Sequence, residues 1–153
     1  MLMGAPSMAD SSPLMRLIER SVDERMLEAI ALERKKGRLL LIGTTNLDAQ
    51  RPVLWDMGAI AGVRSAAALN TFRRVLLASA SIPGMMPPVH FTVTAGGRTF
   101  EELHVDGGTS GQLLMLPPNV ALGDIVPDVG FPVARRLFVI RNGKLGAEFS
   151  PVA

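Results

Sequence analysis

The chain has 153 residues, of which 48% are hydrophobic and 20% are charged, and it contains no cysteine. Its length suits one domain, and the charged fraction is too low for a disordered chain, so a folded globular protein is expected. The lack of cysteine excludes disulfide bonds, thiolate metal ligands and a cysteine nucleophile. The formal net charge is only +2, and no aromatic residues are interleaved with the scattered basic ones. Nucleic-acid binding is therefore not expected.

The ends of the chain and its apolar runs give a first view of its organisation. No run approaches the roughly 18 apolar residues that a membrane-spanning helix needs. Residues 1–12 lack the basic and apolar regions of a secretory signal, so a cytoplasmic location is the default expectation and the compartment stays unknown. We expect residues 1–12 to be disordered or non-native, and residues 13–153 to belong to a single domain.

Two helices are predicted near the start of the chain. Ser12 followed by Pro13 is typical of a helix beginning, and apolar residues recur after it at helical spacing. An S-x-x-E capping box at Ser21 predicts the start of a second helix. The cations before Gly37 predict that this helix ends near Lys36.

Strand and helix patterns alternate in the rest of the chain. Residues 38–45 (RLLLIGTT) form an apolar run that is too short for a helix and is typical of a strand covered on both faces. The following segments are predicted in order: a strand at 52–57, a helix at 65–78, a hairpin of 89–94 with 98–106, and a last hairpin within 136–145. This order predicts an α/β fold.

Asp106 is the most informative polar residue. It ends a predicted strand and is followed by Gly107 and Gly108. A carboxylate in such a tight turn can present its oxygens to a cleft and act as a general base. The simpler interpretation is that Asp106 caps the turn and that the glycines allow positive φ angles. From the D-G-G sequence alone, the simpler interpretation is favoured.

A Ser-His-Asp triad can be drawn from Ser110, His104 and Asp106. On a strand, His104 and Asp106 would share one face. Ser110, however, does not lie in a G-x-S-x-G sequence between a strand and a helix, so this triad is disfavoured. With only two histidines, a metal site is not expected. No glycine-rich nucleotide motif is present in the sequence.

Two apolar features each have two interpretations. Trp55 can anchor at a lipid interface, but packing in the core is favoured. Met85 and Met86 can form a flexible apolar lip over a substrate, but filling gaps in the core is favoured.

Three segments, taken together and in order, resemble the C-terminal half of bacterial patatin-like phospholipases. They are RLLLIGTTNLDAQRPVLWDMGAIA (residues 38–61), VLLASASIPGMMPPV (residues 75–89) and EELHVDGG (residues 101–108). The resemblance implies a lipid acyl hydrolase, a phospholipase or esterase, with a central, mostly parallel sheet flanked by helices and extended by hairpins. It also implies a Ser-Asp dyad that needs no cofactor and no metal.

The resemblance assigns roles to particular residues. Asp106 would be the proton acceptor, Gly107 and Gly108 would form its supporting turn, and His104 would be a neighbour. The family's glycine-rich oxyanion motif and its G-x-S-x-G nucleophile motif precede the matched region, and neither occurs in these 153 residues. With no nucleophile in this chain, the chain by itself is expected to be inactive, since losing the nucleophile costs on the order of 10⁶ in turnover.

Three functional hypotheses follow. The first is a C-terminal fragment of a patatin-like enzyme, whose partners would be a lipid or acyl-ester substrate and a membrane surface. The second is a non-catalytic remnant that acts as a binding or assembly module, by self-association or by pairing with a separate serine-bearing chain. An exposed apolar strand edge would favour such association. The third and weakest is a hydrolase that uses Ser110.

Overall fold

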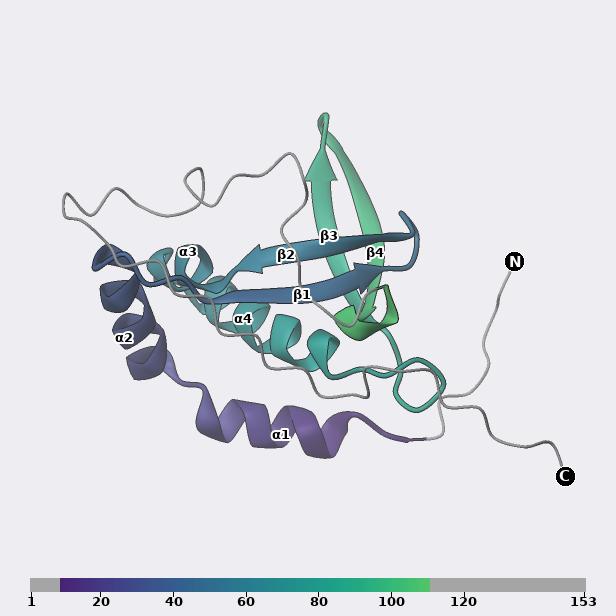
Figure 1. Cartoon of the computed structure of the whole chain (residues 1–153), viewed down its shortest axis with the longest axis horizontal. Coiled ribbons are helices and arrows are strands. Elements are labelled where there is room, and N and C mark those ends of the chain that lie inside the picture. Colours follow the sequence, from purple (N-terminus) through teal and green to yellow (C-terminus); the bar gives the residue numbers. More distant parts are fainter. Residues whose placement is uncertain (1–8, 111–153) are drawn as a thin grey trace, which may run out of the picture.

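The computed structural model describes residues 9–110. In chain order its elements are α1 (Ser12–Ser21), α2 (Glu24–Lys35), β1 (Leu41–Asn46), β2 (Arg51–Asp56), α3 (Met57–Gly62), α4 (Ala66–Ser79), β3 (Val89–Ala95), β4 (Arg98–Asp106) and the 3-10 turn η1 (Gly107–Thr109) (Figure 1). The hairpin predicted within residues 136–145 and most of the stretch predicted to be disordered lie outside the described residues. Within residues 9–110, no helix is both long enough and apolar enough to cross a bilayer.

The four strands form one antiparallel sheet in the order β2–β1–β4–β3. The predicted α/β fold with a central, mostly parallel sheet is therefore wrong for this part of the chain: a small antiparallel sheet packs with four helices. The physical reason lies in the connections. Residues 47–50 join β1 to β2 and residues 96–97 join β3 to β4, and loops this short reverse the chain, whereas a parallel neighbour needs a crossover of a dozen or more residues.

Local signals explain where most elements begin. The predicted hairpin of β3 and β4 is confirmed, and its turn uses Gly96 and Gly97, whose positive φ angles of 56° and 74° suit a two-residue hairpin turn. Helix α4 is confirmed to within a residue, and the Ser65 side chain caps it by accepting the Ala68 N–H. The predicted cap at Ser21 is wrong: α1 runs to that residue, and the next helix has a different cap.

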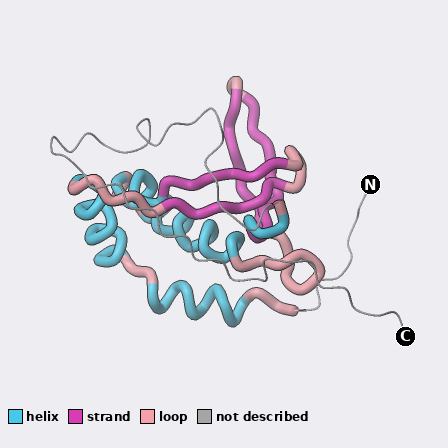
Figure 2. The backbone as a smooth tube through the Cα atoms, in the orientation of Figure 1, coloured by secondary structure: helices cyan, strands magenta, loops and turns pink. Residues whose placement is uncertain are grey.

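The helices cover one face of the sheet. Figure 2 shows the helices (cyan) gathered along one side of the strands (magenta). The buried cluster includes Phe72 and Val75 of α4 and Phe91 of β3, and Trp55 of β2 packs against it. The interpretation of Trp55 as a core residue is confirmed. Burying a side chain such as Phe72, which is 2% exposed, contributes roughly 1.5–3 kcal/mol.

An ion pair fastens α2 to the junction of β2 and α3. Arg34 Nη2 lies 2.7 Å from Asp56 Oδ2, and Arg34 Nε lies 3.2 Å from the same oxygen. Asp56 Oδ1 also accepts the Ala59 N–H at 2.8 Å, which caps α3. The Arg34 stem lies across Gly58, where a Cβ would come within 2.6 Å of Arg34 Cδ. One carboxylate therefore caps a helix and holds a second helix against it.

Opposing effects act on the pKa of Asp56. Partial burial raises the pKa, while the hydrogen bonds from Arg34 and from the N–H groups of Ala59 and Gly58 lower it. The net result is a pKa below the ordinary value of 3.8. A carboxyl whose pKa is lowered by folding adds stability above its unfolded pKa and loses that contribution as the pH falls through its folded pKa.

We predict that Asp56→Asn lowers the free energy of unfolding by about 0.5–1.5 kcal/mol near pH 7, because it removes the charge on Arg34's partner. The difference from wild type is expected to shrink as the pH falls below 3.8 and then through the lowered pKa of the folded carboxyl. Urea unfolding at several pH values measures this difference. Glu28→Gln, on the exposed surface of α2, is the control and should show no such trend. A difference that does not change with pH would contradict the prediction.

Candidate functional site

Asp106 lies at the end of an interior strand. It is the last residue of β4 and faces Thr44 of β1 across the sheet. On the other side, β3 begins only opposite His104, one position short of Val105. The Asp106 N–H instead donates to the Ser81 carbonyl at 2.9 Å. The backbone of Asp106 is thus held from both sides, by β1 and by the segment that follows α4.

The side chain of Asp106 is half-buried and caps the turn after it. Its Oδ1 accepts the Gly108 N–H at 3.1 Å, as the simpler interpretation of D-G-G predicted. Within residues 9–110, its Oδ2 accepts no hydrogen bond. The carboxylate is therefore oriented through one oxygen while the other keeps its lone pairs free of protein donors in the described part of the chain.

The two glycines of D-G-G are needed for space and not for positive φ angles, so that part of the prediction is wrong. A Cβ on Gly107 would lie 2.7 Å from the carbonyl oxygen of Gly43, which is backbone and cannot swing away. A Cβ on Gly108 would lie 3.3 Å from Asp106 Oδ2. Gly107 lets the turn approach β1, and Gly108 leaves room for the carboxylate.

His104 is 1% exposed and belongs to a hydrogen-bond chain that crosses three strands. The Trp55 Nε1–H donates to Thr44 Oγ1 at 2.8 Å, and this oxygen lies 2.8 Å from His104 Nδ1. His104 Nε2 lies 3.2 Å from Glu102 Oε2. The Glu102 carboxylate can only accept, so a hydrogen bond to it requires a proton on Nε2; in the neutral ring Nδ1 then accepts the Thr44 hydroxyl proton. We call these four residues the His104 network.

Aromatic packing surrounds this network. The ring centroids of Trp55 and Phe91 are 5.0 Å apart, and the His104 ring lies 5.0 Å from Phe91 and 5.5 Å from Trp55. The Arg74 guanidinium of α4 lies 5.1 Å from the centroid of the Phe91 ring. Such contacts fix ring orientations, so the imidazole is held in place by its aromatic neighbours as well as by its hydrogen bonds.

The geometry does not assemble the alternative triad. The Ser110 Oγ bonds Thr45 Oγ1 at 2.8 Å and lies 3.3 Å from the Gly107 carbonyl oxygen. Both ring nitrogens of His104 are occupied by other residues of its network. No general base therefore contacts Ser110 among the described residues.

Sequence reasoning missed Thr44, Trp55 and Glu102 as parts of the site. Only Glu102 had a local signal, since it lies two residues from His104 and so shares its face of the strand. The other two come from different strands, and their contacts depend on the pairing of β1 with β2 and β4.

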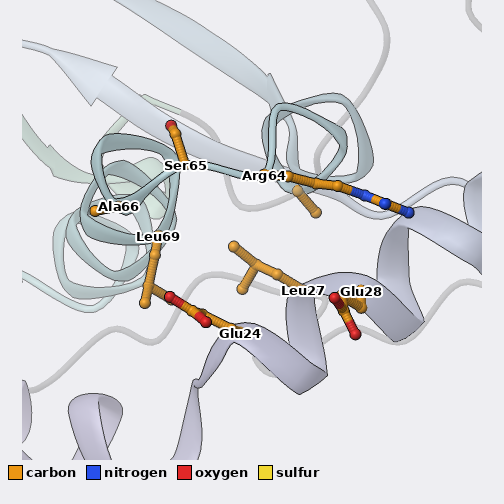
Figure 3. Close-up of a pocket in the computed structure, with 8 residues that line it drawn as sticks. Glu24, Leu27, Glu28, Arg64, Ser65, Ala66 and Leu69 are labelled. Carbon is orange, nitrogen blue, oxygen red and sulfur yellow. The ribbon is translucent and has the colours of Figure 1, made fainter.

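Two hollows in the described part of the chain have linings that do not include Asp106. A hollow of about 160 Å³ lies between α2 and the start of α4 and is lined by Glu24, Glu28 and Arg64 among others (Figure 3). It is at the opposite end of α4 from Ser81, about 20 Å away for a helix of 14 residues. A second hollow of about 310 Å³, largely apolar, involves Met26 and Leu40. Among residues 9–110, no group of three acidic or histidine side chains is placed to hold a metal ion.

Comparison with protein-family models, with curated proteins and with solved structures found no match to this chain.

We predict that Thr44→Val destabilises the fold by about 1–3 kcal/mol, because it leaves the Trp55 N–H and the His104 Nδ1 without a partner in a buried place. Chemical unfolding followed by circular dichroism measures the loss. Thr94→Val, the same change at an exposed position of β3, should cost less than about 0.5 kcal/mol. Equal effects of the two changes would show that the network contributes nothing to stability.

We also predict that Gly107→Ala destabilises the fold by about 1–3 kcal/mol, because its Cβ would push η1 away from the Gly43 carbonyl. Gly108→Ala is the matched control. Its Cβ meets a carboxylate that can rotate, so a smaller loss of stability, below about 1 kcal/mol, is expected. Thermal unfolding of the two variants side by side measures both losses of stability. A larger loss in Gly108→Ala than in Gly107→Ala would contradict the prediction.

Proposed function

We propose that this chain is the C-terminal part of a patatin-like lipid acyl hydrolase, in which Asp106 accepts the proton of a serine that another stretch of polypeptide supplies. One observation carries the proposal: the three segments that resemble the family meet at Asp106. The first supplies Thr44, which pairs with Asp106, and Gly43, against which Gly107 packs. The second supplies Ser81, whose carbonyl accepts the Asp106 N–H, and the third ends in Asp106 itself.

The local chemistry suits a proton acceptor. The hydrogen bond from the Gly108 N–H orients the carboxylate, and Oδ2 is left to accept a proton. In the proposed reaction, the serine hydroxyl gives its proton to Oδ2 while the serine oxygen attacks the ester carbonyl. The proton then goes to the departing alcohol. A water molecule next gives a proton to Oδ2 while its oxygen attacks the acyl-serine, and the acid leaves as this proton returns to the serine oxygen. Oxyanion donors would come from the glycine-rich motif that accompanies the serine in this family.

The chain alone is proposed to lack esterase activity. A positioned base contributes about 10²–10⁴ to a rate, but only when a nucleophile is present to be activated. The geometry at Ser110 gives no support to its use as a substitute, because its hydroxyl bonds Thr45 and not a base.

A second candidate function is an assembly module without catalysis. The observation that favours it is the apolar hollow beside α2, at whose edge Met26 is 41% exposed and Leu40 is 42% exposed. Pairing of this surface with a serine-bearing chain is compatible with both functions, and only activity separates them.

The test is reconstitution. A serine-bearing polypeptide with the G-x-S-x-G motif, encoded upstream of Met1 or taken from a patatin-like enzyme, is co-expressed with this chain and assayed on p-nitrophenyl butyrate. We predict hydrolysis that Asp106→Asn lowers by about 10²–10⁴-fold. Asp48→Asn is the matched control and should keep full activity, since the Asp48 carboxylate, like that of Asp106, accepts one backbone N–H, from Leu103 at 2.7 Å.

The outcomes are distinct. Hydrolysis that survives Asp106→Asn would refute the proposed role. A complex that forms without hydrolysing the ester would favour the assembly module. A fluorophosphonate probe should label the serine of the added polypeptide, and labelling of Ser110 in this chain would overturn the assignment of the nucleophile.

A further inference from the structure

Two exposed apolar side chains of residues 9–110 differ in their setting. Met85 is 56% exposed between α4 and β3, so the prediction that both methionines fill gaps in the core is wrong for Met85. Phe100 is 47% exposed and lies on a regular strand, in the outer part of the β3–β4 hairpin. On a strand, backbone N–H and carbonyl groups can add hydrogen bonds to an apolar contact. The strand around Phe100 is therefore the better candidate for a contact with another polypeptide.

One edge of β4 is open along the outer part of this hairpin. β3 pairs with residues 98–104 of β4, whereas β1 pairs only with residues 104–106. Figure 1 shows the hairpin projecting beyond β1 and β2. Edge strands are commonly protected by proline, as β2 is by Pro52, but residues 98–103 contain none. We refer to residues 98–102 as the open edge.

The backbone groups that the open edge presents can be assigned from Leu103. Its N–H donates to Asp48 Oδ2 at 2.7 Å, and its carbonyl accepts the Leu47 N–H at 2.8 Å, so both groups point to the β1 side. Every second residue of a strand points its N–H and carbonyl in the same direction, so those of Thr99 and Glu101 also face this side. No strand among residues 9–110 pairs with them there. Their two donors and two acceptors can therefore accept another strand.

The side chains of the open edge are arranged symmetrically about Phe100. Arg98 lies two residues before Phe100 and Glu102 lies two residues after it, so all three share one face of β4. Arg98 is exposed and makes no ion pair within residues 9–110. Glu102 uses Oε2 for His104, and its Oε1 accepts no hydrogen bond from the described residues. A positive and a negative group thus flank one aromatic ring at equal spacing.

We propose that the open edge binds a second copy of this chain, with β4 pairing antiparallel to β4 across a two-fold axis at Phe100. The axis places Arg98 of each copy opposite Glu102 of the other, which gives two pairs of opposite charge, and it places the two Phe100 rings side by side. Thr99 of each copy then lies opposite Glu101 of the other, and their free backbone groups exchange four hydrogen bonds. This interface is separate from the hollow beside α2 and does not rest on the proposed function.

The charges select this register over its neighbours. An axis at Glu101 would place the two Glu101 carboxylates opposite each other, and like charges in that position are destabilising. An axis at Thr99 would place Arg98 opposite Phe100 and leave both charges of the open edge without a partner. A second copy in the register centred on Phe100 therefore satisfies both the backbone and the side chains.

Cysteine cross-linking of the full chain tests the register, since the natural chain contains no cysteine. Across the axis, the two Cα atoms of residue 100 would be about 4.5 Å apart, within reach of a disulfide. Those of residue 99 would be about 8–9 Å apart, which is too far. With oxidised glutathione as the electron acceptor, Phe100→Cys should form a disulfide-linked dimer at least about tenfold faster than Thr99→Cys. Equal rates, or faster linkage through residue 99, would overturn the proposal.

Sedimentation velocity over a range of concentrations tests the charge pairs without cross-linking. Arg98→Glu should weaken self-association at least about fivefold, because both attractive pairs become repulsive. Arg51→Glu is the matched control, because it makes the same charge change at an exposed position of β2, and it should leave association unchanged. Glu102→Gln should weaken association less than Arg98→Glu does, since it removes two attractions without adding repulsion, and its amide oxygen can still accept the His104 proton.

The remaining outcomes are also decisive. A wild-type chain that stays monomeric at every concentration and a Phe100→Cys chain that does not cross-link would refute the interface. Self-association that Arg98→Glu leaves unchanged would place the contact elsewhere, for example at the hollow beside α2, and would equally refute it.

Discussion

The short ladder between β1 and β4 is the contact on which the rest of the structure depends. It joins only three residue pairs, yet it turns two hairpins into one sheet and sets Asp106 opposite Thr44. All three β1 residues of the ladder are polar and at least 95% buried, so each needs a partner. Thr44 finds His104 and Trp55, and Thr45 bonds the Asp106 carbonyl. A slip of one residue would turn Thr44 to the other face and break these bonds, so buried polar groups specify the register that positions the carboxylate.

Elements with local signals could be predicted from the sequence, and the pairing of strands far apart in the chain could not. The helix at residues 66–79 follows from its N-cap and from the helical spacing of its apolar residues, and the hairpin follows from the turn at Gly96 and Gly97. Each of these signals spans only a few residues. The apolar run at residues 38–45 predicts an interior strand covered on both faces, within a sheet that is expected to be mostly parallel. In the structure β1 is interior but antiparallel, and its most buried positions are Thr44 to Asn46 and not the leucines before them. Helix α3 was missed because its cap, Asp56, also ends a strand.

In the candidate site, too, local features could be predicted from the sequence and contacts between distant segments could not. Asp106 and the need for small residues after it were visible in the sequence, because D-G-G is a local pattern. The reason for Gly107 was not visible, since the atom that excludes a Cβ belongs to Gly43, far away in the chain. The partners of His104 come from β1 and β2 as well as β4. Their meeting depends on sheet order, which pattern analysis of one sequence does not specify.

The bond between Ser81 and Asp106 has a consequence for how such a protein can change over time. The same backbone that carries Ile82 and Met85 also steadies the carboxylate at the end of β4. An insertion or deletion that reshaped the loop after α4 would also disturb the position of the Asp106 carboxylate. Change at this surface is therefore easier through exchange of the exposed side chains than through remodelling of the loop, because exchange leaves the shared hydrogen bond in place.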